Sequence, residues 1–193
     1  MKNAIFGFSV KDIVEISMLV AISILLDKFV KIPFGLTGGS INIAMVPLFV
    51  ISLRHGWFKT LISCGVVFGF ITCLLDDYGL FTYPLEYLIP FGSICLVSLL
   101  SKLILDQNKS VFIRMLIFSG ISFAILAIRI IFASIDSVIF WEYTFDAALL
   151  YNIPYVLLSG VACIIVMCAL LPVIDRLNNM FKTDYILSIE ENN

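Results

Sequence analysis

Long apolar runs separated by short polar segments constrain the fold of this chain more than any other feature. Of its 193 residues, 61% are hydrophobic and only 13% are charged, whereas a soluble domain has about 25% charged residues. One helical crossing of a bilayer takes about 20 apolar residues, so six crossings use nearly all of the apolar positions. The sequence therefore predicts an all-α integral membrane protein with no separate soluble domain.

Six apolar runs are candidate transmembrane helices, and together they predict one helical bundle that makes up a single domain, residues 1–193. They cover residues 13–30, 41–53, 57–75, 85–105, 111–133 and 147–173. The second run is the shortest, about 20 Å long as a helix, so we expect it to extend into a loop or to pack behind its neighbours. An even number of crossings places both termini on one side of the membrane.

Lysine and arginine are distributed unevenly between the two sides of this predicted bundle. With the N-terminus inside, nine of them are cytoplasmic: Lys2, Lys11, Arg54, Lys59, Lys102, Lys109, Arg114, Arg176 and Lys182. Only Lys28 and Lys31 fall in outer loops. Because positive residues stay on the cytoplasmic side, the sequence predicts a multi-pass protein of the cell membrane with both termini in the cytoplasm. His55 then reads as a cytoplasmic loop residue rather than a ligand or catalytic base.

Several functional classes lack their characteristic sequence features in this chain. The net charge is −2 and no basic stripe is present, which argues against nucleic-acid binding. No GxxxxGK[ST], HExxH or GxSxG motif occurs, so the chain has neither a phosphate-binding loop for ATP nor a catalytic motif of those types. The five cysteines lie in apolar runs without a CxxC pair. We expect no enzyme activity, no metal and no cofactor, and any transport must be driven by an ion gradient or by another subunit.

Acidic and aromatic residues gather near the predicted outer ends of the helices. The acidic ones are Asp27, Asp76, Asp77, Glu86, Asp136, Glu142 and Asp146, and the aromatic ones are Tyr78, Phe81, Tyr83, Tyr87, Phe140, Trp141, Tyr143, Phe145, Tyr151 and Tyr155. Carboxylates neutralise a small organic cation, and aromatic faces attract it. The same pattern also fits an ordinary interfacial belt of aromatic residues, so both interpretations stay open.

Two segments place ionisable residues within or near the membrane. Glu86 follows Pro84 in what we expect to be the first turn of the fourth helix, where the helix dipole favours a carboxylate. Tyr83 and Tyr87 are four residues apart and can share the face of Glu86, so both are candidate substrate-binding residues together with Glu86. Arg129 lies inside the fifth apolar run, and we expect it to pair with a carboxylate such as Asp136 or Glu86.

The overall pattern resembles the substrate-binding S components of energy-coupling factor vitamin transporters. The stretch Gly38-Gly39-Ser40-Ile41-Asn42-Ile43-Ala44-Met45-Val46-Pro47, followed by Leu53-Arg54-His55-Gly56, is similar to the segment that enters the second helix of many such proteins. Ser17-x-x-x-Ala21 falls where S components carry an Ala-x-x-x-Ala motif that docks on the transmembrane T subunit, and small residues four apart allow close helix packing.

Three motifs resemble the thiamine-specific S components most closely: Leu85-Glu86-Tyr87-Leu88, Ile139-Phe140-Trp141 and Leu150-Tyr151-Asn152. The resemblance implies that Glu86 hydrogen-bonds an aminopyrimidine, that Trp141 stacks on the ligand, and that Tyr87, Tyr151 and Asn152 line the site. In another register the position of Asn152 falls on Val156. One departure is Ala133, which stands where the family can present a histidine.

We therefore expect this chain to capture a vitamin, in the first place thiamine, from the extracellular side of the bilayer. The resemblance implies a T subunit and two cytoplasmic ATPases as partners. An S component for another vitamin or precursor, such as riboflavin or a pyrimidine, is the nearest alternative. A small intramembrane enzyme that uses Asp76, Asp77 and Glu86, or a membrane scaffold without a ligand, represents a different class.

Overall fold

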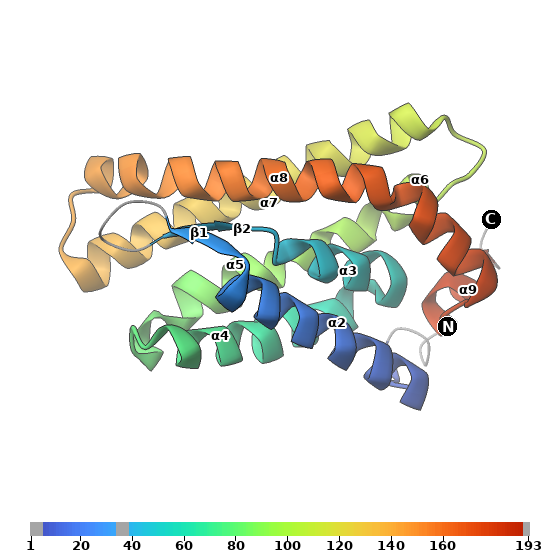
Figure 1. Ribbon diagram of the computed structural model, residues 1–193, viewed down its shortest axis with the longest axis horizontal. Helices are drawn as coiled ribbons and strands as arrows, with labels where there is room; N and C mark the ends of the chain where they lie inside the picture. Colours follow the sequence, from blue (N-terminus) through green and yellow to red (C-terminus); the bar gives the residue numbers. More distant parts are fainter. Residues whose placement is uncertain (1–5, 34–38, 191–193) are drawn as a thin grey trace.

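The computed structural model describes residues 6–33 and 39–190, and it is built almost entirely from helices (Figure 1). Lys2 and Gly38, which contributed to the predictions above, lie outside the described residues. The first half contains α2 (Val10–Phe29), strands β1 (Lys31–Pro33) and β2 (Ser40–Asn42), α3 (Met45–Thr60), the π-helix η1 (Leu61–Phe68) and α4 (Gly69–Asp76). The second half contains η2 (Leu80–Thr82), η3 (Tyr83–Leu88), α5 (Ile89–Gly92), η4 (Ser93–Leu100), α6 (Ser101–Ile104), α7 (Val111–Trp141), α8 (Phe145–Met180) and α9 (Asp184–Glu190).

Four helical segments in the described part of the chain are long and apolar enough to cross a membrane. They are Met45–Asp76, Leu80–Ile104, Val111–Trp141 and Phe145–Met180. The first of these is broken at Gly56, where φ of 81° and ψ of 173° leave the helical region. With α2 and this break, the described residues form six principal helical segments, and the predicted all-helical membrane fold is confirmed.

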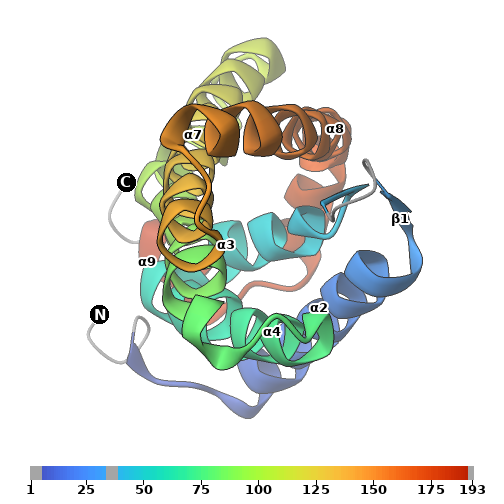
Figure 2. The same cartoon turned by 90° about the vertical axis from the view of Figure 1, so that its left-hand side faces the viewer.

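The helices are arranged around α3. The two longest helices, α7 and α8, pack side by side along their length, and α2 lies on the opposite side of α3 (Figure 1). Viewed from the turn between α7 and α8, helices α2 and α4 lie across from this pair (Figure 2). The short antiparallel pair of β1 and β2 aligns Ile32 with Ile41, and β2 contacts α8 at Ser159.

The break at Gly56 is covered by the C-terminal helix α9. A Cβ atom on Gly56 would lie 2.8 Å from the ring of Tyr185, and its positive φ also favours glycine. The hydroxyl of Thr183 donates a hydrogen bond to the backbone carbonyl of Arg54. Tyr185 contacts the Ser101 hydroxyl at 2.8 Å and donates to the Ser98 carbonyl at 3.0 Å. Helix α9, which the sequence analysis did not predict, therefore ties the break in α3 to η4 and α6.

A buried cluster of charged side chains joins the start of α2 to the residues around Gly56. Lys59 Nζ lies 2.8 Å from Asp12 Oδ2, and His55 Nδ1 lies 3.1 Å from Asp12 Oδ1. Arg54 forms an ion pair with Glu15 and donates hydrogen bonds to Asn178 and to the backbone. Ionised groups tolerate burial only when they are paired and hydrogen-bonded, and this cluster meets that condition.

The position of His55 corrects the sequence analysis, which placed it in a cytoplasmic loop. Its side chain is fully buried, with the two ring nitrogens 3.1 Å from Asp12 and 3.5 Å from Glu15. The prediction was wrong because the chain around Arg54 and Gly56 is covered by α2 and α9, which the local sequence does not reveal.

Asp12 also stabilises the start of α2 directly. The Ser9 hydroxyl accepts a hydrogen bond from the Asp12 backbone N–H, and the Asp12 carboxylate accepts one from the Ser9 backbone N–H, both at 3.2 Å. This reciprocal arrangement satisfies two of the free backbone donors at a helix N-terminus. One carboxylate thus fixes both where α2 begins and how α2 packs on α3.

We predict that Lys59→Met destabilises the protein strongly. The substitution leaves the buried carboxylate of Asp12 without its ammonium partner, and breaking a buried ion pair in this way costs about 3–5 kcal/mol. The measurement is the free energy of unfolding in detergent micelles.

The matched control is Lys102→Met, because Lys102 is exposed and lies at the same end of the bundle. We expect little change for that variant. Adding Asp12→Asn to Lys59→Met should recover part of the loss, because the uncompensated charge is then removed. Equal losses for Lys59→Met and Lys102→Met would show that the cluster contributes nothing.

Candidate functional site

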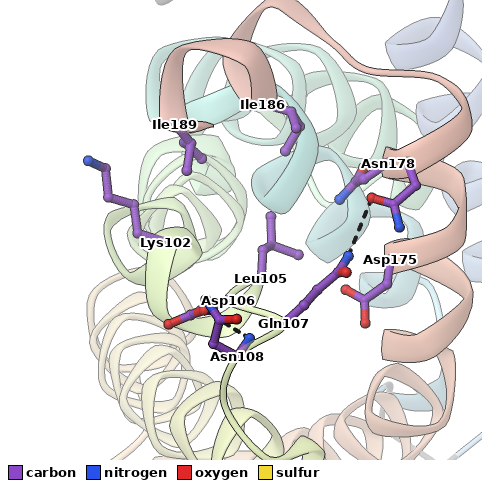
Figure 3. Close-up of a pocket in the computed structure, with 10 residues that line it drawn as sticks. Lys102, Leu105, Asp106, Gln107, Asn108, Asp175, Asn178, Ile186 and Ile189 are labelled. Carbon is purple, nitrogen blue, oxygen red and sulfur yellow. Dashed lines mark hydrogen bonds between the residues drawn. The ribbon is translucent and has the colours of Figure 1, made fainter. Parts of the chain in front are cut away.

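Two cavities of the described residues are candidate sites, and the first lies beside α9. It has a volume of about 290 Å³ and is lined mainly by polar side chains of α6, α8 and the loop between α6 and α7 (Figure 3). Its acidic groups already have partners: Asp175 pairs with Arg114 at 2.6 Å. The backbone N–H of Asn108 and the ammonium of Lys109 lower the pKa of Asp106. This cavity therefore offers no free buried charge to a ligand.

The second cavity, which we call the outer cavity, has a volume of about 380 Å³. It lies between the β1–β2 pair, the end of α2, α4, η3 and the facing ends of α7 and α8. Its lining consists of Asp27, Lys31, Pro33, Gly39, Ser40, Asn42, Thr72, Asp76, Tyr78, Thr82, Glu86, Tyr87, Phe91, Arg129, Asp136, Ser137, Trp141, Tyr143, Tyr151, Asn152 and Tyr155. This volume is within the range of roughly 300–1,000 Å³ that is usual for small-molecule sites.

The lining of the outer cavity is acidic and rich in aromatic rings. Four carboxylates line it, those of Asp27, Asp76, Glu86 and Asp136, against the two basic side chains of Lys31 and Arg129. Seven aromatic residues complete the wall: Tyr78, Tyr87, Phe91, Trp141, Tyr143, Tyr151 and Tyr155. Carboxylates and aromatic faces together form a suitable environment for an organic cation.

Two of these carboxylates are held by a network that closes one wall of the cavity. Lys28 Nζ lies 3.2 Å from Asp27 and 2.5 Å from Asp76. The Asn42 side chain donates to Asp27 at 2.9 Å, and the Tyr87 hydroxyl donates to Asp76 at 3.0 Å. These contacts join α2, β2, α4 and η3. The charges of Asp27 and Asp76 are therefore balanced by Lys28 within the cavity wall.

Glu86 is in a different situation. It lies in the first turn of η3, after Pro84, and its carboxylate lines the outer cavity. It interacts with the charges of Arg129, Asp136 and Asp76, but none of these interactions is a hydrogen bond. In the described part of the chain, the Glu86 carboxylate is therefore free to accept hydrogen bonds from a bound molecule.

Trp141 stands at the mouth of the outer cavity. It is the last residue of α7, and 48% of its surface is exposed. Its ring meets that of Tyr78 edge to face, with centroids 6.0 Å apart. A partly exposed aromatic face beside a cavity can stack on a planar ligand without leaving its place in the fold.

Asn152, on α8, connects this helix to α7 and contacts Tyr155 of the cavity wall. Its side-chain amide donates to the Ala148 carbonyl at 2.9 Å and to the Ser134 and Ser137 hydroxyls at 3.4 and 3.3 Å. Its oxygen accepts a hydrogen bond from Tyr155 at 2.7 Å. The amide is thus occupied by protein groups, and in this geometry it positions Tyr155.

The structure brings five of the six predicted substrate-binding residues to the outer cavity: Glu86, Tyr87, Trp141, Tyr151 and Asn152. The exception is Tyr83, whose hydroxyl donates to the Gly65 carbonyl at 3.2 Å and whose ring packs on Phe70. Tyr83 does not line the cavity, because the helix turns its side chain toward η1. The prediction that Tyr83 shares the face of Glu86 that meets the ligand is therefore wrong.

Arg129 also differs from its prediction. It makes no ion pair with Asp136 or Glu86 within 4.0 Å; its guanidinium instead lies 4.8 Å from the Phe91 ring centroid and 3.3 Å from Met45 Sδ. Phe91 and Asn42 were not predicted as lining residues. Asn42 lies in the Gly38–Pro47 stretch that the sequence analysis singled out, whereas no signal in the sequence pointed to Phe91.

The predicted docking residues lie away from the outer cavity. Ser17 and Ala21 are exposed on α2, with Ile13 and Leu25 one turn before and after them on the same stripe and also exposed. The stripe is apolar and carries small residues at its centre, which permits a close approach of another helix.

Comparisons with known proteins agree with this architecture. The family model described as "Thiamine transporter protein" matches residues 13–179. The "Thiamine transporter ThiT" of Bacillus subtilis (strain 168) is 28% identical to this chain, in a match that covers 86% of this chain and 92% of that protein. A solved structure described as "Native-SAD phasing for ThiT from Listeria monocytogenes serovar." has a TM-score of 0.72 and 21% identity, over 86% of this chain and 96% of that one.

We predict that Asn152 and Tyr155 are energetically coupled. Asn152→Leu leaves the buried Tyr155 hydroxyl without its acceptor, which costs about 1–3 kcal/mol, whereas removing both polar groups is closer to neutral. Unfolding free energies of Asn152→Leu, Tyr155→Phe and the double variant form a double-mutant cycle. We expect the loss in the double variant to be smaller than the sum of the single losses by about 1 kcal/mol or more. Additive losses would mean that this hydrogen bond does not position Tyr155.

Proposed function

Since this chain belongs to the thiamine transporter protein family, we propose that its outer cavity binds thiamine from the extracellular side of the membrane. The chain is a multi-pass protein of the cell membrane and a transporter rather than an enzyme. The observation that carries the proposal is the free carboxylate of Glu86 in an acidic, aromatic cavity. Thiamine combines an aminopyrimidine that donates hydrogen bonds with a positively charged thiazolium ring, and the cavity provides groups that suit both.

The cavity geometry supports a role for each of the five predicted residues that line it. Glu86 accepts hydrogen bonds from the aminopyrimidine, because its carboxylate accepts none from the residues that the structure describes. Trp141 stacks on the ligand at the mouth, and Tyr151 lines the side of the cationic ring. Tyr87 and Asn152 hold the wall in place through Asp76 and Tyr155.

Transport requires work that this chain does not supply, because its sequence has no phosphate-binding loop. We propose that it is the S component of an energy-coupling factor transporter, and that a transmembrane T subunit and two cytoplasmic ATPases provide this work. The exposed stripe of α2 that includes Ser17 and Ala21 is the surface on which the T subunit docks.

The first experiment measures thiamine binding to the purified chain by isothermal titration. A charge-assisted hydrogen bond contributes about 1.5–3 kcal/mol, so we expect Glu86→Gln to weaken binding by one to two powers of ten. The matched control is Glu142→Gln, because Glu142 is exposed at the same end of the bundle and does not line the cavity. A wild-type protein that binds riboflavin or a pyrimidine in place of thiamine contradicts the proposed ligand.

Fluorescence of the two tryptophans gives an independent readout of the same titration. Stacking of the ligand on Trp141 should quench the emission of this residue. Trp57 packs against Phe6 and Phe58 and does not line the outer cavity, so its emission should not change. We expect Trp141→Phe to abolish the quenching and Trp57→Phe to leave it intact. Quenching that persists in Trp141→Phe would contradict the proposal that Trp141 stacks on the ligand.

We predict that Ala21→Trp blocks assembly with the T subunit. A large side chain at this position prevents the close helix approach that small residues allow, while the outer cavity stays intact. Co-purification with the T subunit and thiamine binding are measured on the same preparation.

The control for bulk is Ala124→Trp, which places the same side chain on the exposed surface of α7. Loss of assembly with retained binding in Ala21→Trp, together with normal assembly of Ala124→Trp, is the expected result. Unchanged co-purification of Ala21→Trp contradicts docking through this stripe.

A further inference from the structure

Asp136 is a buried carboxylate that no part of the fold explains. It lies on α7, is 3% exposed, and lines the outer cavity. The Trp141 side chain is a hydrogen-bonding neighbour of this carboxyl group. Its Oδ1 atom, however, is buried without any hydrogen-bond partner in the described part of the chain.

The basic groups around the cavity do not neutralise Asp136. Lys28 is placed between Asp27 and Asp76, at 3.2 and 2.5 Å. Arg129 lies two turns earlier on the same helix, but it contacts the Phe91 ring and Met45 instead. No ion pair involving Asp136 is formed among the described residues, whereas Asp27 and Asp76 both have one.

A carboxylate without a countercharge is costly in such a place, because burial removes its hydration and no positive charge replaces it. A group of this kind is stabilised when a molecule that brings a positive charge or a hydrogen-bond donor enters the cavity. Asp136 also lies five residues before Trp141 on α7, so its carboxylate and the indole ring can act on the same part of a ligand.

We propose that Asp136 is the counter-ion of the ligand's positive charge, and that it makes the outer cavity selective for cationic over neutral ligands. This inference rests on the proposed binding of thiamine. Glu86 recognises the hydrogen-bond donors of the aminopyrimidine, and Asp136 recognises the charge of the thiazolium ring beside Trp141. The two lining carboxylates that form no ion pair among the described residues thus recognise two different properties of one molecule.

The test compares thiamine with a neutral isostere in which the charged ring nitrogen is replaced by carbon. Isothermal titration of both compounds is carried out on the wild type, on Asp136→Asn and on the control Asp146→Asn. Asp146 is an exposed residue at the start of α8 and does not line the cavity. The substitution removes the charge at each position and keeps the size of the side chain.

We expect Asp136→Asn to weaken thiamine binding about ten- to a hundredfold and to change binding of the neutral isostere less than about threefold. Asp146→Asn should leave both affinities unchanged. The midpoint of thermal unfolding without ligand should stay the same or rise in Asp136→Asn, because the substitution removes an uncompensated buried charge. Asp136→Ser provides a second neutral variant and should show the same loss of selectivity.

The outcomes separate the inference from the function on which it rests. A wild type that binds neither compound overturns both. Wild-type binding of thiamine with the same preference for the cation in Asp136→Asn and Asp136→Ser overturns only the role of Asp136. Equal weakening of both compounds, or a lowered unfolding midpoint without ligand, assigns Asp136 a purely structural role and also overturns the inference.

Discussion

The ion pair between Asp12 and Lys59 is the contact on which the arrangement of the other elements depends. Both groups are buried, so this contact forms in one geometry only, with the start of α2 against the residues that follow Gly56. A helix of 20 residues is about 30 Å long and stiff. Fixing one end of α2 therefore also determines where Asp27 and Lys28 lie at the other end, beside the outer cavity. There Lys28 joins α2 to α4 through Asp76, and Asn42 joins it to β2.

The sequence predicts the all-helical membrane fold well because hydropathy and length are properties of the chain alone. The sequence also predicts that several cavity residues gather at one end of the bundle, because Glu86, Trp141 and Tyr151 lie near predicted helix ends. It fails where the rotation of a helix decides the outcome. Tyr83 and Glu86 are three residues apart, yet η3 turns the tyrosine toward Gly65. His55 is buried because α2 and α9 cover the break at Gly56, and Arg129 finds Phe91 rather than a carboxylate. These contacts join residues far apart in the sequence, so no local pattern predicts them.

The four carboxylates of the outer cavity fall into two groups with different tasks. Asp27 and Asp76 share Lys28 and hold the wall together, so their charge is balanced within the protein. Among the described residues, Glu86 and Asp136 form no ion pair, and they contribute the excess negative charge of the site. Ala133, which stands where the family can present a histidine, is buried and does not line the cavity. The nearest ionisable group on α7 is Asp136, about one turn later, so this chain offers a carboxylate in that region of the site.

The break at Gly56 has a consequence for how the protein enters the membrane. The helical part before it, Met45–His55, is about 16 Å long, too short to cross the hydrocarbon core of about 30 Å by itself. Its side chains are buried in the protein almost without exception, and its last turn contains Arg54, which is costly to place in lipid. Such a segment gains little free energy by moving from the translocon into lipid without its neighbouring helices. We expect it to reach its final depth after α7 and α8 have been synthesised, so that the bundle is completed around it late in biogenesis.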